Sequence, residues 1–123
     1  ISLNSLIKSF LPAMSVGCSV ISFTNQNAVL ALKLSEDINN SDFPSGSLNI
    51  LTGNFENIVE DVGAHVEIRL AAIYSNISND LLETLDVKGS DSVKRIVNLP
   101  SDEGLGSIIP FVETKTVWHP KGQ

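Results

Sequence analysis

The stretch from Phe43 to Gly53 constrains the fold of this chain more than any other part of its sequence. Residues 44–46 (Pro-Ser-Gly) form a turn sequence directly after an apolar helical pattern. Residues 48–51 have the apolar character of a buried strand, and Gly53 follows at the strand's end. This order of helix, tight turn, buried strand and glycine predicts one joint of a nucleotide-binding type of α/β sheet.

Short apolar runs alternate with short helical patterns along residues 1–100. Strands are predicted at Cys18–Phe23, Leu48–Leu51, Leu70–Tyr74 and Arg95–Leu99. Helical patterns cover Leu3–Met14, Ala28–Asn40, Phe55–Val62 and the region of Leu81–Leu85. Strands separated by single helices indicate βαβ units, and right-handed crossovers place helices on both faces of the sheet. We therefore expect a three-layer, Rossmann-like open parallel sheet of about four to five strands.

Several residues predict where the helices begin, end and face. Pro12 lies inside the first apolar stripe, where we expect it to kink or interrupt the helix. Val29 and Leu32 are expected to face the core. Helix boundaries are predicted at Gly17, Asn54, Gly63 and either Ser78 or Asn79.

Composition restricts the class of protein and its partners. The chain has 123 residues, of which 42% are apolar and 18% charged, and this composition is typical of a globular domain. The net charge of −6 argues against nucleic acid or an anionic membrane surface as partner. No apolar run approaches the roughly 20 residues that span a bilayer. Cys18 is the single cysteine, so no internal disulfide is possible, and we expect a reducing, cytoplasmic location.

The pattern changes at residue 101. Residues 101–107 form a glycine-rich acidic loop, and Phe111 to Trp118 alternates like a strand with two different faces. We therefore divide the chain into an α/β domain over residues 1–100 and a C-terminal loop and extended strand over residues 101–123. The strand is a candidate edge for oligomerisation or for a partner.

Residues 1–100 resemble the cofactor-binding part of the aldehyde dehydrogenases. Leu11 to Ile21 is similar to the family's A-P-A-L-A-A-G-N-T-V-V segment, and Phe43 to Gly53 is similar to its F-P-P-G-V-V-N-V-V-P-G segment. His65 to Ile68 resembles the H-P-x-V that precedes the next strand, Leu70 to Tyr74 resembles that strand, and Val93 to Val97 resembles the approach to the catalytic strand. The resemblance implies the Rossmann-like fold and an NAD(P) site at the carboxyl ends of the strands.

The resemblance also implies a set of cofactor-binding positions, and several hold altered residues. Phe23 stands where the family has a ribose-binding lysine, and its ring cannot donate that hydrogen bond. Gln26 stands at the glutamate of the family's K-P-S-E motif, and Gly53 matches the glycine after the second strand. Ser75 and Asn76 occupy the F-T-G-S turn, where a Cβ restricts the approach to a pyrophosphate.

The catalytic positions that the resemblance implies are also altered. Leu99 stands where the family has its general-base glutamate. The nucleophilic cysteine of the family would lie beyond this chain, and Cys18 matches a structural asparagine instead. We therefore expect no catalytic residue here, and an NAD(P) site that is weakened or lost.

Other reactive side chains have simpler interpretations. Cys18 is expected to be a small core residue, and His65 a loop residue rather than a base or metal ligand. His119 beside Trp118 belongs to a terminal strand. The carboxylate pairs 36–37 and 102–103 are expected to be solvated charge. We expect no metal site.

Three functions remain open on this sequence. The first is a non-catalytic structural, scaffold or assembly module that forms homo-oligomers or joins a larger protein assembly. The second is the cofactor-binding fragment of an active NAD(P)-dependent aldehyde dehydrogenase whose cysteine lies elsewhere. The third is a sensor that holds a nucleotide without turning it over.

Overall fold

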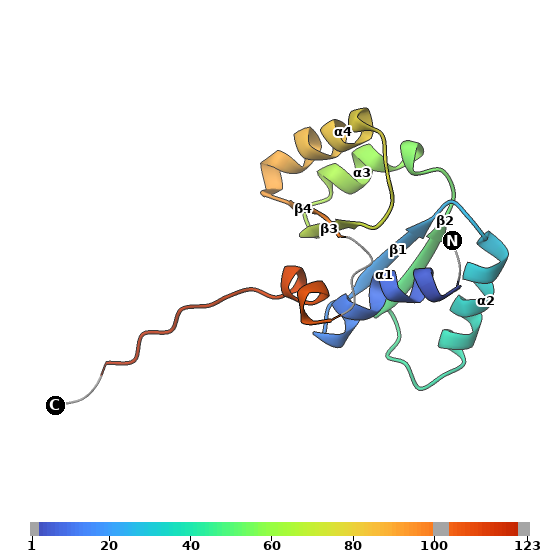
Figure 1. The fold of residues 1–123 in the computed structure, drawn as a ribbon, viewed down its shortest axis with the longest axis horizontal. Coiled ribbons are helices and arrows are strands. Elements are labelled where there is room, and N and C mark those ends of the chain that lie inside the picture. The colour runs from blue at the N-terminus through green and yellow to red at the C-terminus, as the bar shows by residue number, and fades with distance from the viewer. Residues whose placement is uncertain (1–2, 100–103, 121–123) are drawn as a thin grey trace.

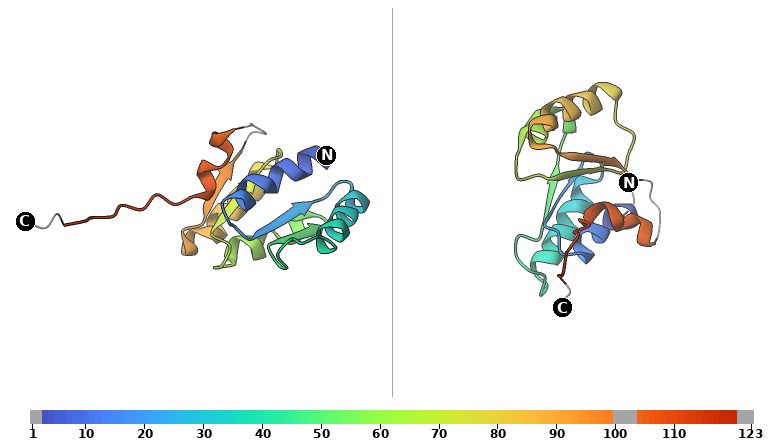
Figure 2. Two further views of the ribbon diagram at one scale, coloured as in Figure 1. Left: turned by 90° about the horizontal axis from the view of Figure 1, so that it is seen from below. Right: turned by 90° about the vertical axis from the view of Figure 1, so that its left-hand side faces the viewer.

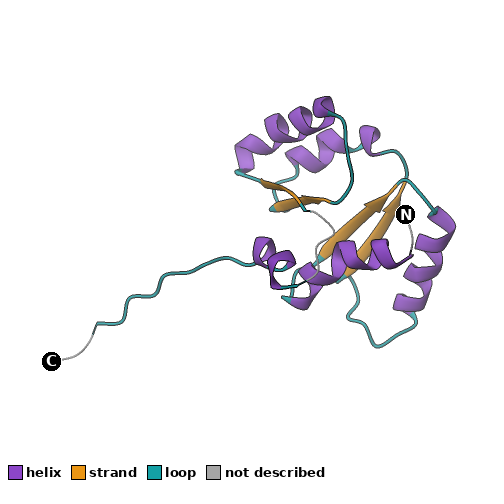
Figure 3. Cartoon of the chain, viewed as in Figure 1, coloured by secondary structure: helices purple, strands orange, loops and turns teal. Residues whose placement is uncertain are grey.

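The computed structural model describes residues 3–99 and 104–120, which fold as alternating helices and strands (Figures 1 and 3). The α-helices are α1 (Leu3–Ser15), α2 (Ala28–Asn39), α3 (Val59–Ala64) and α4 (Asn79–Gly89). The strands are β1 (Val20–Thr24), β2 (Leu48–Thr52), β3 (Leu70–Ile73) and β4 (Arg95–Asn98). Short 3-10 turns are η1 (Phe55–Asn57), η2 (Ser90–Ser92), η3 (Leu105–Ser107) and η4 (Ile109–Phe111). The predicted α/β class is confirmed.

The strands form two parallel pairs rather than one sheet. β1 pairs with β2 in the register Val20 to Leu48, and β3 pairs with β4 in the register Leu70 to Arg95. In the described residues no ladder joins β1 to β3, so the predicted continuous sheet of four to five strands is wrong for this structure. The local patterns identified each strand, but they carry no information on which strand edges meet.

The first half of the chain, α1 to β2, has its helices on one face of the strand pair. Leu6 and Phe10 from α1 and Ala31 from α2 form one buried cluster. Val20, Leu48 and Ile50 pack against this cluster, and their spacing of two places them on the same face. On the opposite face Ile21 is 57% exposed and Leu51 is 46% exposed. The expected helical cover on both faces is therefore absent from this pair.

Helix α2 is rotated relative to the sequence prediction. Val29 and Leu32, which we expected in the core, are 82% and 59% exposed. Ala31 is fully buried instead, and Leu34 packs beside it. The small Ala31 lets the helix approach the first helix and the strands closely. Because α2 has apolar residues on two faces, its periodicity alone did not determine the buried one.

The second half, residues 55–98, is organised by the contact between α3 and α4, which lie together above β3 and β4 in Figure 1. Gly63 does not end its helix as predicted but lies buried within α3. A Cβ at Gly63 would lie 2.6 Å from the Cβ of Lys88 on α4. Glycine is therefore needed there for close helix packing rather than for a turn. Lys88 also forms a 3.0 Å ion pair with Glu60 of α3.

Several helix boundaries match their predictions. The C-terminal end of α1 is closed by Gly17 at φ 85°, whose N–H donates to the Met14 carbonyl at 3.0 Å. The Asn54 side chain accepts from the backbone N–H of Glu56, and the Ser78 hydroxyl accepts from that of Leu81. Pro12, in contrast, neither ends nor interrupts α1, because one missing N–H is outweighed by the packing of that helix.

The C-terminal part contains no strand within residues 104–120. Turns η3 and η4 lie near α1 in Figure 1, and residues 112–120 then run away from the folded body without regular structure (Figure 2). The strand predicted over Phe111 to Trp118 is therefore absent here. A strand requires a neighbour for its backbone groups, and residues 3–99 and 104–120 provide none at that position.

Candidate functional site

The carboxyl ends of β1 and β2 bring together three of the predicted cofactor positions. Because the strands are parallel, Thr24 and Thr52 end side by side. The backbone N–H of Gly53 donates to the Thr24 carbonyl at 3.2 Å. The buried hydroxyl of Thr24 donates to the Gln26 carbonyl at 2.9 Å and accepts from the Gln26 N–H at 3.3 Å. Thr24 therefore organises this edge.

Phe23 closes the same edge with an aromatic contact. Its ring lies 5.5 Å from that of Phe55, centroid to centroid, at a tilt of 55°. Its Cζ is also 3.9 Å from where a Cβ would be built on Gly53. An aromatic pair thus lies beside the glycine, where the family resemblance implied a lysine that reaches a ribose. The edge offers apolar contact at this point and no side-chain donor.

Ser75 and Asn76 do not share a sheet edge with these residues. Both are exposed and follow β3, which pairs with β4 rather than with β1. The structure therefore unites Phe23, Gln26 and Gly53 at one sheet edge, and it places Ser75 and Asn76 at the edge of the second sheet.

The apolar side chain of Leu99 and the weakly acidic hydroxyl of Tyr74 lie at the edge of the second strand pair. The Leu99 N–H donates to the Ile73 carbonyl at 2.9 Å, so Leu99 extends the ladder and its side chain supplies no base. The hydroxyl of Tyr74 is buried and has no hydrogen-bond partner among the described residues. Burial raises the pKa of Tyr74 above its ordinary value of 10.0. The hydroxyl is therefore protonated at neutral pH.

Cys18 links the two ends of the chain. It is half-buried rather than a core residue, and its Sγ donates to the carbonyl of Phe111 at 3.6 Å. Since the partner is a carbonyl oxygen, no base activates this thiol through that contact. Cys18 is therefore a structural residue rather than a nucleophile. It does not fill the core but holds η4 against the turn between α1 and β1.

His65 and Lys94 form a structural link between two loops. The Lys94 ammonium donates to the carbonyls of His65, at 2.8 Å, and of Ile68. The Nδ1 atom of His65 accepts from the backbone N–H of Glu67 at 3.3 Å. Burial lowers the pKa of Lys94 from its ordinary value. Sequence reasoning missed Lys94, whose long side chain gave no sign of two carbonyl partners.

The described residues contain no cluster of three or more histidine, cysteine or acidic side chains placed to hold a metal ion. His119 is exposed, and so are Glu36 and Asp37. The carboxylates at 102 and 103 lie outside the described residues.

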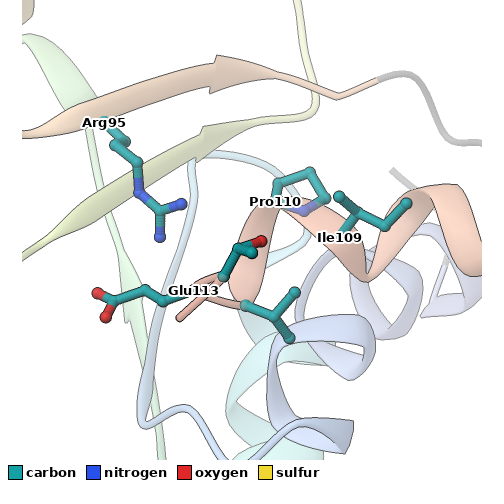
Figure 4. Close-up of a pocket in the computed structure, with 6 residues that line it drawn as sticks. Arg95, Ile109, Pro110 and Glu113 are labelled. Carbon is teal, nitrogen blue, oxygen red and sulfur yellow. The ribbon is translucent and has the colours of Figure 1, made fainter. Parts of the chain in front are cut away.

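An open cleft lies away from all of the predicted positions (Figure 4). It has a volume of about 580 Å³ and is lined by Arg95, Ile109, Pro110, Val112, Glu113 and Thr114. Arg95 comes from β4, and the other residues come from η4 and the segment that follows it. Only an indirect signal of this cleft is present in the sequence, namely the alternation along Phe111 to Trp118. The cleft combines an apolar wall with one charge of each sign.

Comparisons with protein-family models, curated proteins and solved structures gave no match to this chain. The longest helix of the described residues, α1, has 13 residues, and no helix there is long and apolar enough to cross a bilayer.

Proposed function

We propose that this chain is a non-catalytic, aldehyde dehydrogenase-like α/β module that acts as a structural part of an assembly. The chemistry at the strand ends supports the non-catalytic part. Phe23 and Phe55 fill the edge beside Gly53, and Leu99 stands where a general base is expected. The predicted nucleotide positions belong to two separate strand pairs.

The observation that carries the assembly role is the apolar surface that the fold leaves uncovered. The accessible surface of the chain is 8958 Å², above the value of about 6,400 Å² for a compact monomer of 13.2 kDa, and the exposed segment over residues 112–120 contributes to the difference. Exposed apolar side chains occur on α2, on one face of β1 and β2, and in the C-terminal part. They include Val29, Leu32, Ile21, Leu51, Val117 and Trp118. Exposed apolar side chains on the open face of a strand pair are typical of surfaces that bind a partner.

The proposal includes the arrangement of the sheet. β1 and β3 each have an edge without a ladder partner among the described residues. In a Rossmann-like sheet of four strands, these two edges would pair and the strand order would be β2-β1-β3-β4. We propose that covering the open face of β1 and β2 in an assembly favours this closed sheet.

Two measurements on the purified chain test the proposal. We expect light scattering coupled to size exclusion to give a mass above that of a monomer, and calorimetry to give no heat at millimolar NAD. A monomeric mass at every concentration would contradict the assembly role. Heat that saturates with NAD would contradict a purely structural role and favour a nucleotide site.

The second candidate function is a nucleotide-binding sensor without turnover. Gly53 favours it, because its φ of 153° brings bare backbone to the carboxyl edge of a parallel strand pair. A saturable heat with NAD but no aldehyde-dependent NADH formation would support the sensor. The third candidate is the cofactor-binding fragment of an aldehyde dehydrogenase whose catalytic cysteine lies elsewhere. Formation of NADH from an aldehyde, after a segment with that cysteine is added, would support this function instead.

A further inference from the structure

The segment over residues 112–120 has the composition of a strand but no strand partner. Val112, Thr114, Thr116 and Val117 are β-branched, a residue type that favours extended backbone. Every residue from 112 to 120 is exposed, and Trp118 is 89% exposed. Among the described residues, no backbone hydrogen bond joins residues 113–120 to the rest of the chain. Such a segment is suited to pairing with another strand.

We propose that residues 112–116 pair antiparallel with the same residues of a second copy, about a two-fold axis at Thr114. This inference rests on the proposed assembly function and specifies its partner and register. In that register Glu113 lies directly opposite Lys115 of the second copy, and Lys115 lies opposite Glu113 of the second copy. Val112 likewise lies opposite Thr116. Opposite charges and β-branched residues are both favourable cross-strand pairs.

The charges select this register over the neighbouring ones. An axis at Glu113 would place two carboxylates opposite each other, and an axis at Lys115 would place two ammonium groups opposite each other. A parallel pairing in register would repeat both repulsions at once. Like charges directly opposite each other destabilise a strand pair. Of these arrangements, only the antiparallel pair with its axis at Thr114 places each carboxylate opposite an ammonium group.

The same register gives the exposed tryptophan a site. Trp118 lies on the strand face of Thr114 and Thr116, because side chains alternate. The ladder ends at Val112, because Ile109–Phe111 form the 3-10 turn η4. Trp118 of the second copy therefore lies beyond the ladder on the side of η4, whose Ile109 and Pro110 line the cleft of Figure 4 with Arg95. The cleft volume of about 580 Å³ accommodates an indole ring. An arginine beside an indole adds a cation–π attraction. The pairing would thus cover one of the largest exposed apolar side chains of the chain.

Charge variants of the full chain test the register. Glu113→Lys alone and Lys115→Glu alone each turn both cross-strand pairs into repulsions, so we expect roughly tenfold weaker self-association in light scattering. Mixing the two variants restores opposite charges at both positions, so a heterodimer of near wild-type affinity is expected. The double variant Glu113→Lys with Lys115→Glu is also complementary and should self-associate as the wild type does.

A cysteine placed on the axis gives an independent readout. In a Cys18→Ser background, Thr114→Cys brings two thiols to facing positions and should form an intermolecular disulfide under mild oxidation. Val117→Cys is the matched control, because its residue lies off the axis and should crosslink far more slowly. A wild-type dimer with charge variants of equal affinity, or equal crosslinking at both positions, overturns the register and leaves the assembly function standing. A wild-type chain that stays monomeric overturns both.

Discussion

The backbone of Val93 is in a conformation that valine rarely adopts. Its φ is 51°, in the left-handed region, and its side chain is 84% exposed, so no packing compensates for the strain. The Val93 N–H donates to Ser90 and the Lys94 N–H donates to Gly89, which is the pattern in which helices end with glycine. The strain therefore results from residue choice at a helix end.

We predict that Val93→Gly raises the free energy of unfolding by about 1 kcal/mol, because the relieved strain exceeds the entropy that glycine gains in the unfolded chain. Urea denaturation followed by circular dichroism measures the change. Val66→Gly is the matched control, since Val66 is also exposed but has no positive φ. Equal midpoints for the two variants would show that the left-handed backbone is not strained.

The hydroxyl of Tyr74 costs stability where it lies. It is buried without a partner among the described residues, so Tyr74→Phe should raise the free energy of unfolding by about 1 kcal/mol at pH 7. The raised pKa means that the folded chain holds this proton after the unfolded chain has released it. The free energy of unfolding therefore does not depend on this proton below pH 10.0. It falls as pH rises from there through the folded pKa.

Urea midpoints at neutral pH and above pH 10.0 check both effects. Tyr74 is the only tyrosine of the chain, so Tyr74→Phe should remove the part of the fall in unfolding free energy at alkaline pH that comes from tyrosine ionisation. If the variant were no more stable at neutral pH, the hydroxyl would not be an unpaired buried group. If it lost as much stability in alkali as the wild type, the alkaline loss would not come from Tyr74.

At the scale of elements, glycine determines how closely α3 and α4 approach. A Cβ on Gly63 would lie 2.6 Å from the Lys88 Cβ and 3.5 Å from the Leu85 carbonyl oxygen, so the helices must separate to admit it. We predict that Gly63→Ala lowers the free energy of unfolding by about 1–3 kcal/mol. Thermal unfolding measures the loss. Gly106→Ala is the control, because nothing lies within 4 Å of its added Cβ, and a comparable loss there would refute the packing argument.

The elements themselves were largely predictable, while their faces and partners were not. Apolar periodicity and caps such as Ser78 located all four α-helices, because those signals are local in sequence. Gly63 was misinterpreted because a glycine for close packing and a glycine for a helix end look alike in sequence. Residues 111–118 were expected as a strand from their alternation, but a strand also depends on a neighbour that the sequence pattern does not provide.

The candidate site was predictable by position but not by chemistry. Phe23, Gln26 and Gly53 lie at one edge because parallel strands end together, whereas Ser75, expected at the same edge, follows β3 in the other strand pair. The buried Thr24 hydroxyl and the Phe23–Phe55 contact were missed, since both depend on side-chain packing across segments. The cleft beside Arg95 was missed for the same reason, because it forms only where η4 lies near β4.

At the scale of the whole molecule, the chain consists of two similar halves, and the ring contact between Phe23 and Phe55 lies between them. Each half is a helix, a strand, a helix and a strand, and the substantial contacts between elements lie within residues 3–52 or within residues 55–98, apart from those of the C-terminal turns. Each half has its own buried leucine, Leu6 in the first and Leu85 in the second. Because cooperativity follows from shared packing, we expect the two halves to open separately.

We predict that Leu6→Ala and Leu85→Ala each destabilise one half only, by about 2–5 kcal/mol. Hydrogen exchange followed by mass spectrometry gives the readout for each peptide. Leu6→Ala should lower protection in α1, β1, α2 and β2, whereas Leu85→Ala should lower it in α3, α4, β3 and β4. The two variants control for each other, because they delete the same atoms from two buried sites. If either one lowered protection equally in both halves, the chain would be a single cooperative unit.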